Sequence, residues 1–103
     1  MNESQIISDV IIPDLDKKGW KAHDIFHYKV EFKIDVTVKP RYADVVLFAL
    51  GKPIGVIEVK NAGSDLILAI QQAISYAEDL DAKLIYATDE YQGVPTGPRL
   101  FME

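Results

Sequence analysis

Cysteine is absent from this sequence of 103 residues, which excludes disulfide bonds and thiolate zinc sites and is compatible with a reducing cytoplasm. There is no signal-peptide pattern and no apolar run of membrane-spanning length, so we expect a cytoplasmic location and no membrane partner. Lys and Arg number 11 against 16 Asp and Glu, for a net charge of −5. This balance excludes a broad basic surface, and any affinity for DNA would have to come from a metal ion, local lysines or partner domains.

Repeats, low-complexity segments and internal linkers are also lacking, and the length is that of one domain, residues 1–103. The hydrophobic fraction of 49% is typical of a globular protein and indicates a packed core. No G-x-x-x-x-G-K-[ST] loop occurs, so the chain does not encode the nucleotide site of a DNA-translocating motor.

The most informative stretch runs from Asp44 to Lys60. Two apolar runs, 45–50 and 54–59, are separated by the turn residues Gly-Lys-Pro, and Glu58 lies inside the second run. This pattern predicts a β-hairpin that is buried on both faces at the centre of a sheet. Charged groups are costly to bury without a partner, so the acidic and basic residues in these strands call for an explanation.

The length of the turn decides whether those charges meet. A three-residue loop, residues 51–53, would place Val46 opposite Glu58 and Asp44 opposite Lys60, with all the charges on one face. A two-residue loop would move Asp44 to the other face, and we therefore expect the longer loop. Two carboxylates and one ammonium then converge, and two hard oxygen ligands suit Mg²⁺ or Mn²⁺ better than zinc.

The N-terminal segment is predicted to be a helix that begins with a capping box at Asn2 and Gln5. We expect it to kink or to break and restart at Pro13, and to end at Gly19. Its apolar stripe consists of Ile6, Ile7, Val10, Ile11 and Leu15. Trp20 is expected to pack back on the helix.

Residues 28–39 alternate between apolar and polar side chains, which predicts a long strand with one solvated face at or near a sheet edge. Arg41 follows the next turn and is a candidate phosphate contact. His23 and His27 are four residues apart, but the segment is short and lacks a third ligand, so we interpret them as surface histidines.

After Lys60, Ser64 is expected to cap a second helix, which is predicted to lie on the sheet. Its predicted apolar face consists of Leu66, Ile67, Ile70, Ala73, Ile74, Ala77 and Leu80. Gln72 and Tyr76 are neighbours on its surface because they are four residues apart. Residues 83–88 are predicted to form a strand parallel to an earlier one, followed by a loop, residues 89–98, and a short last strand from 99 to 103.

The spacing D-x13-E-x-K, with E-x-K at the end of a hairpin, resembles the PD-(D/E)xK nuclease superfamily. The stretch RYADVVLFALGKPIGVIEVKNAG resembles, more narrowly, the N-terminal nuclease domain of type I restriction enzyme motor (R) subunits. This resemblance implies an α/β fold, a restriction-endonuclease-like α-β-β-β-α-β core whose central mixed sheet is flanked by helices. It also implies that Asp44, Glu58 and the Val59 carbonyl hold Mg²⁺, with Mn²⁺ able to substitute, and that Lys60 positions the attacking water.

Three further residues match the pattern of the restriction module. Glu3 lies ten residues before Pro13, as does the first-helix glutamate in the E…P…GW pattern, which implies a site carboxylate; an acid favoured by the helix dipole is an equal alternative. Gln72 and Tyr76 match its Q-x-x-x-Y motif, which implies that they orient the lysine or the DNA backbone. The alternative for this pair is a half-exposed flank of the helix.

The function implied is a metal-dependent DNA endonuclease domain, the cleavage module of a type I restriction-type enzyme or a stand-alone relative. The expected partners are DNA and the helicase motor, specificity and methylation components of a restriction complex; a homo-oligomer is compatible with the sequence. Two alternatives remain open. In the first, Asp44, Glu58 and Lys60 form a structural salt bridge in a catalytically silent nucleic-acid-binding or protein-interaction module. In the second, the chain is a small-ligand-binding or protein-interaction α/β domain whose likeness to the nucleases is incidental.

Overall fold

The computed structural model describes residues 2–21, 24–34, 41–60, 66–91, 94–95 and 99–102. Its elements are α1 (Glu3–Ile6), the π-helical segment η1 (Ile7–Ile11), α2 (Ile12–Lys17), β1 (Phe26–Ile34), β2 (Arg41–Ala49), β3 (Lys52–Lys60), α3 (Leu66–Leu80), β4 (Leu84–Tyr91), β5 (Val94–Pro95) and β6 (Arg99–Met102). The predicted cap at Ser64, the turn at Pro40 and the part of the alternating strand beyond Ile34 lie outside the described residues.

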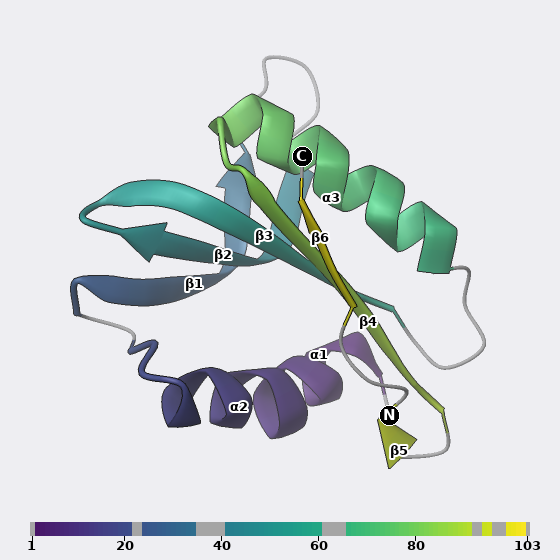
Figure 1. Ribbon diagram of the computed structural model, residues 1–103. Helices are drawn as coiled ribbons and strands as arrows, with labels where there is room; N and C mark the ends of the chain where they lie inside the picture. The colour runs from purple at the N-terminus through teal and green to yellow at the C-terminus, as the bar shows by residue number, and fades with distance from the viewer. Residues whose placement is uncertain are drawn as a thin grey trace.

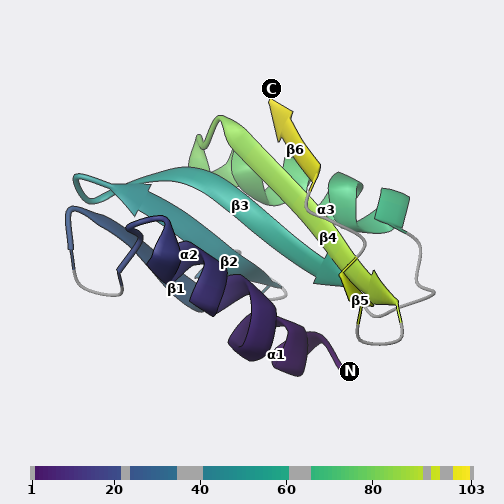
Figure 2. The same cartoon turned by 60° about the horizontal axis from the view of Figure 1, so that its bottom comes forward.

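The strands form one mixed sheet in the order β1-β2-β3-β4-β5, and β6 pairs with β4. Strands β3 and β4 are parallel, as predicted for a helical crossover, and the other pairings are antiparallel. One face of the sheet is covered by α1 and α2 and the other by α3 (Figure 1). Figure 2 shows the same layers with α1 and α2 in front of the sheet and α3 behind it. The α/β fold with a central mixed sheet flanked by helices is confirmed, as is the central place of the β2–β3 hairpin. Among the described residues, no helix has the length and apolar character needed to cross a bilayer.

The N-terminal helix begins and ends where the sequence predicts. The Gln5 N–H donates to the Asn2 side chain at 2.8 Å and the Asn2 N–H donates to the Gln5 side chain at 3.0 Å, which completes the capping box. Gly19 ends it with a φ of +94°, and the Trp20 N–H donates to the Leu15 carbonyl. The break expected at Pro13 is the π-helical turn of η1 just before it, which widens the helix where the proline ring would otherwise crowd the preceding turn.

The sheet separates two hydrophobic clusters. The cluster under the N-terminal helix contains the side chains of Ile6, Ile7, Ile11, Leu15, Val45, Ile57 and Val59. The cluster under α3 contains those of Ile34, Ala43, Val46, Phe48, Val56, Ala73, Tyr76, Ala77, Ala82 and Ile85. Since β2 and β3 contribute to both clusters, both faces of the hairpin are anchored.

The turn of the hairpin differs from the prediction. It is a two-residue turn at Leu50 and Gly51, with Ala49 paired to Lys52, rather than a three-residue loop over residues 51–53. Both turn residues have positive φ, +53° and +78°, as in the type I′ turns that match the twist of a two-stranded ribbon. The prediction was wrong because leucine is unfavourable at positive φ and gives no sequence signal for this turn.

A β-bulge compensates for the shorter turn. The register shifts just beyond Phe48, which pairs with Pro53, so that Ile54 is an extra residue and Leu47 pairs with Gly55. The predicted pairing of Val46 with Glu58 and of Asp44 with Lys60 is therefore wrong. Val46 pairs with Val56 instead, and continuing this register places Asp44 opposite Glu58. Because the turn and the bulge together shift the pairing by two residues, the acidic residues keep the predicted face.

The edge strand β1 also departs from regular alternation. Tyr28 packs in the cluster under the N-terminal helix, whereas Phe32 and Ile34 pack in the cluster under α3. The strand changes face at Glu31, which has a φ of +51°. The neighbouring β2 changes face at the same level, between Ala43 and Val45, so the uniform solvated face predicted for this strand is wrong. The change of face directs the start of β2 toward α3.

Helix α3 lies on the sheet as predicted, with a different face inward. Its buried side chains are Ala69, Ala73, Tyr76 and Ala77, while Ile67 is 62% exposed. The apolar pattern placed Ile67 on the buried face, which is wrong, and it did not include Tyr76, which is buried; the half-exposed flank considered as an alternative therefore does not apply to Tyr76. The small alanine side chains let the helix approach the sheet closely enough to bury the tyrosine ring.

The turn geometry leads to a stability prediction. Leu50 is 79% exposed at positive φ, so Leu50→Asn should raise the free energy of unfolding by about 0.5–1 kcal/mol, because Asn-Gly is a preferred type I′ pair. Urea denaturation measures this change. Leu68→Asn, at a half-exposed position in α3, is the control and should not stabilise the protein. A Leu50→Asn variant no more stable than wild type would contradict the turn assignment.

Candidate functional site

Asp44 and Glu58 lie where β2 and β3 separate. The backbone ladder between the two strands ends at the pair Val45 and Ile57. Beyond it, the Asp44 N–H donates to Glu58 Oε1 at 3.0 Å, and the Val59 N–H donates to Asp44 Oδ2 at 2.8 Å. The carboxylates thus replace the backbone hydrogen bonds that the ladder would have made, which holds both side chains in the gap between the strands.

Glu58 is only 4% exposed. Burial, followed by the negative charge of Asp44, raises the pKa of Glu58 from 4.5 to about 9, while the hydrogen bond from the Asp44 backbone and the charge of Lys60 oppose the rise. Without a cation, the pair therefore retains a proton at a higher pH than an exposed carboxyl group would. Two carboxyl groups held together in this way form a site that favours a positive charge.

Lys60 ends β3 in a half-buried position. Within the described part of the chain, it forms no ion pair with either carboxylate. The structural salt bridge considered as an alternative is thus not formed there. Lys60 is nevertheless near enough for its charge to lower the pKa of Glu58, and its ammonium group remains available for another anion.

A surface cavity of about 330 Å³ lies beside Lys60, between the strand ends and α3. Its lining residues are Arg41, Lys60, Leu68, Gln71, Gln72, Ser75 and Tyr76. The structure thus places both residues of the Q-x-x-x-Y motif next to the lysine. Gln72 is exposed and Tyr76 is buried. The pKa of Tyr76 is raised by burial and then by the charge of Glu58, with a smaller effect from Asp44, so the phenol lies within electrostatic reach of both carboxylates.

The oxygen atoms around the gap suit a divalent cation. Asp44 and Glu58 each use one carboxyl oxygen for a backbone N–H, and a hydrogen bond between the two carboxyl groups, with its shared proton, is what a cation would replace. The Val59 N–H points toward β2, and in a strand the N–H and carbonyl of one residue point to the same side. Two carboxylates and a carbonyl are hard donors, the set that Mg²⁺ and Mn²⁺ prefer.

Glu3, the third predicted site carboxylate, is on a different element from these donors. It lies in α1, on the face of the sheet opposite α3 (Figure 1). Within the described ranges, no three His, Cys, Asp or Glu side chains gather as a metal cluster. A role for Glu3 in the site stays a prediction. His27 lies in β1, where its ring stacks on Phe48 at 4.8 Å, and His23 is outside the described residues.

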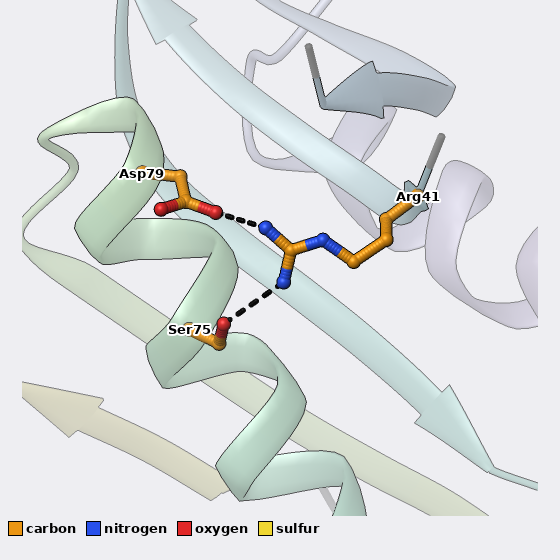
Figure 3. Close-up of polar contacts among 3 residues, drawn as sticks. All are labelled: Arg41, Ser75 and Asp79. Carbon is orange, nitrogen blue, oxygen red and sulfur yellow. Dashed lines mark hydrogen bonds and ion pairs between the residues drawn. The ribbon is translucent and has the colours of Figure 1, made fainter. Parts of the chain in front are cut away.

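The sequence did not reveal how Arg41 is held. Arg41 begins β2 and reaches across to α3, where it donates to Ser75 Oγ at 3.0 Å and pairs with Asp79 (Figure 3). Its guanidinium carbon also lies 5.2 Å from the centre of the Tyr76 ring. One signal was present, because Asp79 stands in the last turn of a helix, where the dipole disfavours an acid.

The raised pKa of Glu58 leads to a prediction about stability and pH. In metal-free buffer the folded protein keeps a proton between pH 4.5 and about 9 that the unfolded chain has released. Stability should therefore fall as pH rises through this window, by at most about 1.4 kcal/mol per pH unit. Glu58→Gln mimics the protonated form, so its stability relative to wild type should increase with pH.

Urea denaturation of both proteins between pH 5 and 8, with EDTA present, measures the difference. Glu78→Gln, which changes an exposed carboxylate on α3, is the matched control and should follow the wild type. A Glu58→Gln variant that loses several kcal/mol at pH 7 would instead identify Glu58 as half of a structural pair.

Comparison with known families agrees with this geometry. The family model for the type I restriction enzyme R protein N terminus matches residues 22–93, which is more than half of the chain and includes Asp44, Glu58, Lys60, Gln72 and Tyr76. Searches of curated proteins and of solved structures found no match. The chain belongs to the family of type I restriction enzyme R protein N-terminal domains.

Proposed function

We propose that the chain is a metal-dependent DNA endonuclease domain that hydrolyses phosphodiester bonds. The observation that carries this proposal is the pair of carboxyl groups held by backbone N–H groups at the end of an apolar strand, one of them only 4% exposed. A buried acid beside a second acid, with a lysine two residues away that forms no ion pair among the described residues, is poorly explained as a source of stability. Membership of the restriction enzyme family supports the same reading.

The cation would be held by Asp44, Glu58 and the Val59 carbonyl, and we expect Mg²⁺, with Mn²⁺ as a substitute. When bound, the cation acts as a Lewis acid and lowers the pKa of a bound water molecule. The protein's own contribution is to fix the two carboxylates against backbone N–H groups, so that little reorganisation is needed. Coordination of a cation by Glu58 would release the proton held by the carboxyl pair to solvent.

Lys60 acts on the substrate rather than on the cation, because an ammonium group has no lone pair to donate to a metal. Its N–H groups hold the attacking water and offset negative charge that develops on the scissile phosphate. Gln72 and Tyr76 line the adjoining cavity and orient the lysine or the DNA backbone. Their contributions are indirect, so their loss slows cleavage without ending it.

We also infer the setting in which the domain works. It would act in the cytoplasm as the cleavage module of a restriction complex, together with a motor and with specificity and methylation components, or as a stand-alone relative. The net charge of −5 gives the chain little general attraction for DNA. Partner domains would therefore deliver the DNA, while this domain supplies the chemistry.

The first functional prediction concerns metal binding. Isothermal titration calorimetry with Mn²⁺ should show binding to the wild type, and Mn²⁺ should raise its melting temperature. Asp44→Ala removes a ligand and should weaken binding by at least about tenfold. Asp81→Asn, which changes a carboxylate that is 91% exposed, is the control and should bind as the wild type does. Equal heats from wild type and Asp44→Ala would count against the site.

The second functional prediction separates binding from chemistry. Lys60→Ala should lower the rate of Mg²⁺-dependent plasmid nicking by at least about 100-fold, while Mn²⁺ binding persists or tightens because a nearby positive charge is lost. Glu58→Ala should lose metal binding and cleavage together. Gln72→Ala and Tyr76→Phe should slow nicking by a smaller factor. The assay uses the complete restriction assembly if the domain alone binds DNA too weakly.

A matched lysine on the same strand serves as the control for charge. Lys52 is exposed at the opposite end of β3, so Lys52→Ala changes the net charge equally but should leave the nicking rate near that of wild type. Undiminished cleavage by Lys60→Ala would rule out the assigned role. Absence of both metal binding and cleavage in the wild type would favour a silent binding module.

A further inference from the structure

The cavity beside Lys60 has the lining of an anion site. Among the described residues that line it, the charged ones are Arg41 and Lys60, and the others include two glutamine amides, a serine hydroxyl and a phenol. None of these described lining residues is acidic. Most of these groups donate hydrogen bonds, and two carry positive charge, in a chain whose overall charge is negative. The cavity is thus a local exception to the acidic character of the domain.

Arg41 is held at this cavity in a fixed orientation. The Tyr76 ring lies beneath the guanidinium group. Ser75 Oγ accepts a hydrogen bond from one guanidinium nitrogen at 3.0 Å. Figure 3 shows both Ser75 and Asp79 reaching the same guanidinium group from α3. A planar guanidinium group binds carboxylates and phosphates with the same two-pronged geometry. The carboxylate of Asp79 therefore occupies a place that a phosphate oxygen could take.

The contact between Arg41 and Asp79 can be exchanged at little cost. Their side chains are 35% and 44% exposed, and ion pairs at that level of exposure contribute roughly 0–1 kcal/mol. Asp79 also stands in the last turn of α3, where no basic residue offsets the helix dipole. An acid in this unfavourable position is explained if it serves as the counter-ion of the arginine while no substrate is present.

The position of Arg41 fits a phosphate next to the one that is cut. It precedes Asp44 on β2 by three residues, which in an extended strand is roughly 10 Å. It faces α3, because β2 changes face between Ala43 and Val45. Arg41 therefore borders the same cavity as Lys60 while standing back from the carboxylate pair.

We propose that Arg41 binds a non-scissile phosphate of the DNA backbone and that Asp79 is the anion that this phosphate replaces. The proposal rests on the function proposed above and adds a substrate contact and an exchange to it. Ser75 and Tyr76 keep the guanidinium group in place during the exchange, so the arginine is ordered before DNA arrives. Asp79 acts only through Arg41 and is a positioning residue.

The test measures binding of a labelled DNA duplex by fluorescence anisotropy, with the full chain and with Ca²⁺ in place of Mg²⁺ to suppress cleavage. Arg41→Gln should weaken binding by about tenfold, the worth of a charge-assisted hydrogen bond. The slope of log K against log salt should also become shallower by about 0.9, as expected when one phosphate contact is lost. Arg41→Lys keeps the charge without the planar guanidinium group, so its affinity for DNA should lie between those of the wild type and Arg41→Gln.

Asp79→Asn frees the arginine and should tighten binding by roughly two- to fivefold, the range that corresponds to an exposed ion pair. Asp81→Asn removes the same charge from the turn residue just after α3 and is the matched control, with a smaller effect. In the Arg41→Gln background, Asp79→Asn should have no more effect than Asp81→Asn, because the two residues act as a unit.

A purely structural ion pair would give a different result. Arg41→Gln and Asp79→Asn would then lower the melting temperature equally, with the salt slope unchanged, and this outcome would overturn the proposal. An Asp79→Asn effect that persists without Arg41 would also overturn it. If the Arg41 and Asp79 variants bind DNA as the wild type does while Lys60→Ala still abolishes cleavage, the phosphate contact of Arg41 is ruled out and the endonuclease assignment stands. If the wild type neither binds nor cuts DNA, the assignment itself fails.

Discussion

The exchange of backbone hydrogen bonds for carboxylate hydrogen bonds determines the geometry of this domain's site. Once Asp44 and Val59 donate their N–H groups to carboxylates instead of to the opposite strand, β2 and β3 are free to diverge. The divergence opens a gap without leaving backbone donors unsatisfied, which would be costly in a buried place. The site therefore does not need a loop to hold it, because two central strands of the sheet supply both the rigidity and the opening.

Alternation along β3 divides the work between the two faces of the sheet. Ile57 and Val59 pack against the N-terminal helix, whereas Glu58 and Lys60 are directed toward α3. Apolar side chains that interleave with the charged ones thus anchor the strand from behind. This arrangement explains how a largely apolar strand tolerates a buried acid: the energetic cost of Glu58 is offset by the packing of its immediate neighbours.

Rules that depend on neighbouring residues predicted much of the fold. The helix end at Gly19, the central hairpin and the parallel crossover follow from spacing and from turn chemistry. The shared face of the two carboxylates was also predicted, but from a turn of the wrong length, and it holds because the bulge at Ile54 compensates for the shorter turn. The features that the sequence did not predict depend on backbone strain and on tertiary packing. Leu50 and Glu31 adopt positive φ, which their residue types disfavour, so no local pattern shows the turn or the change of face. Burial of Tyr76 depends on how closely α3 approaches the sheet, and the partners of Arg41 lie 34 and 38 residues away in sequence.

The bulge at Ile54 has a consequence for how sequences of this family can vary. The two-residue turn alone would put the acidic residues on opposite faces, and the extra residue in β3 restores them to one face. Insertions or deletions between Ala49 and Gly55 should therefore be tolerated in pairs, because a change of one residue would move Glu58 and Lys60 to the opposite face of the sheet. The length of this turn region, rather than its composition, is then the property that selection is expected to preserve among relatives that cleave DNA.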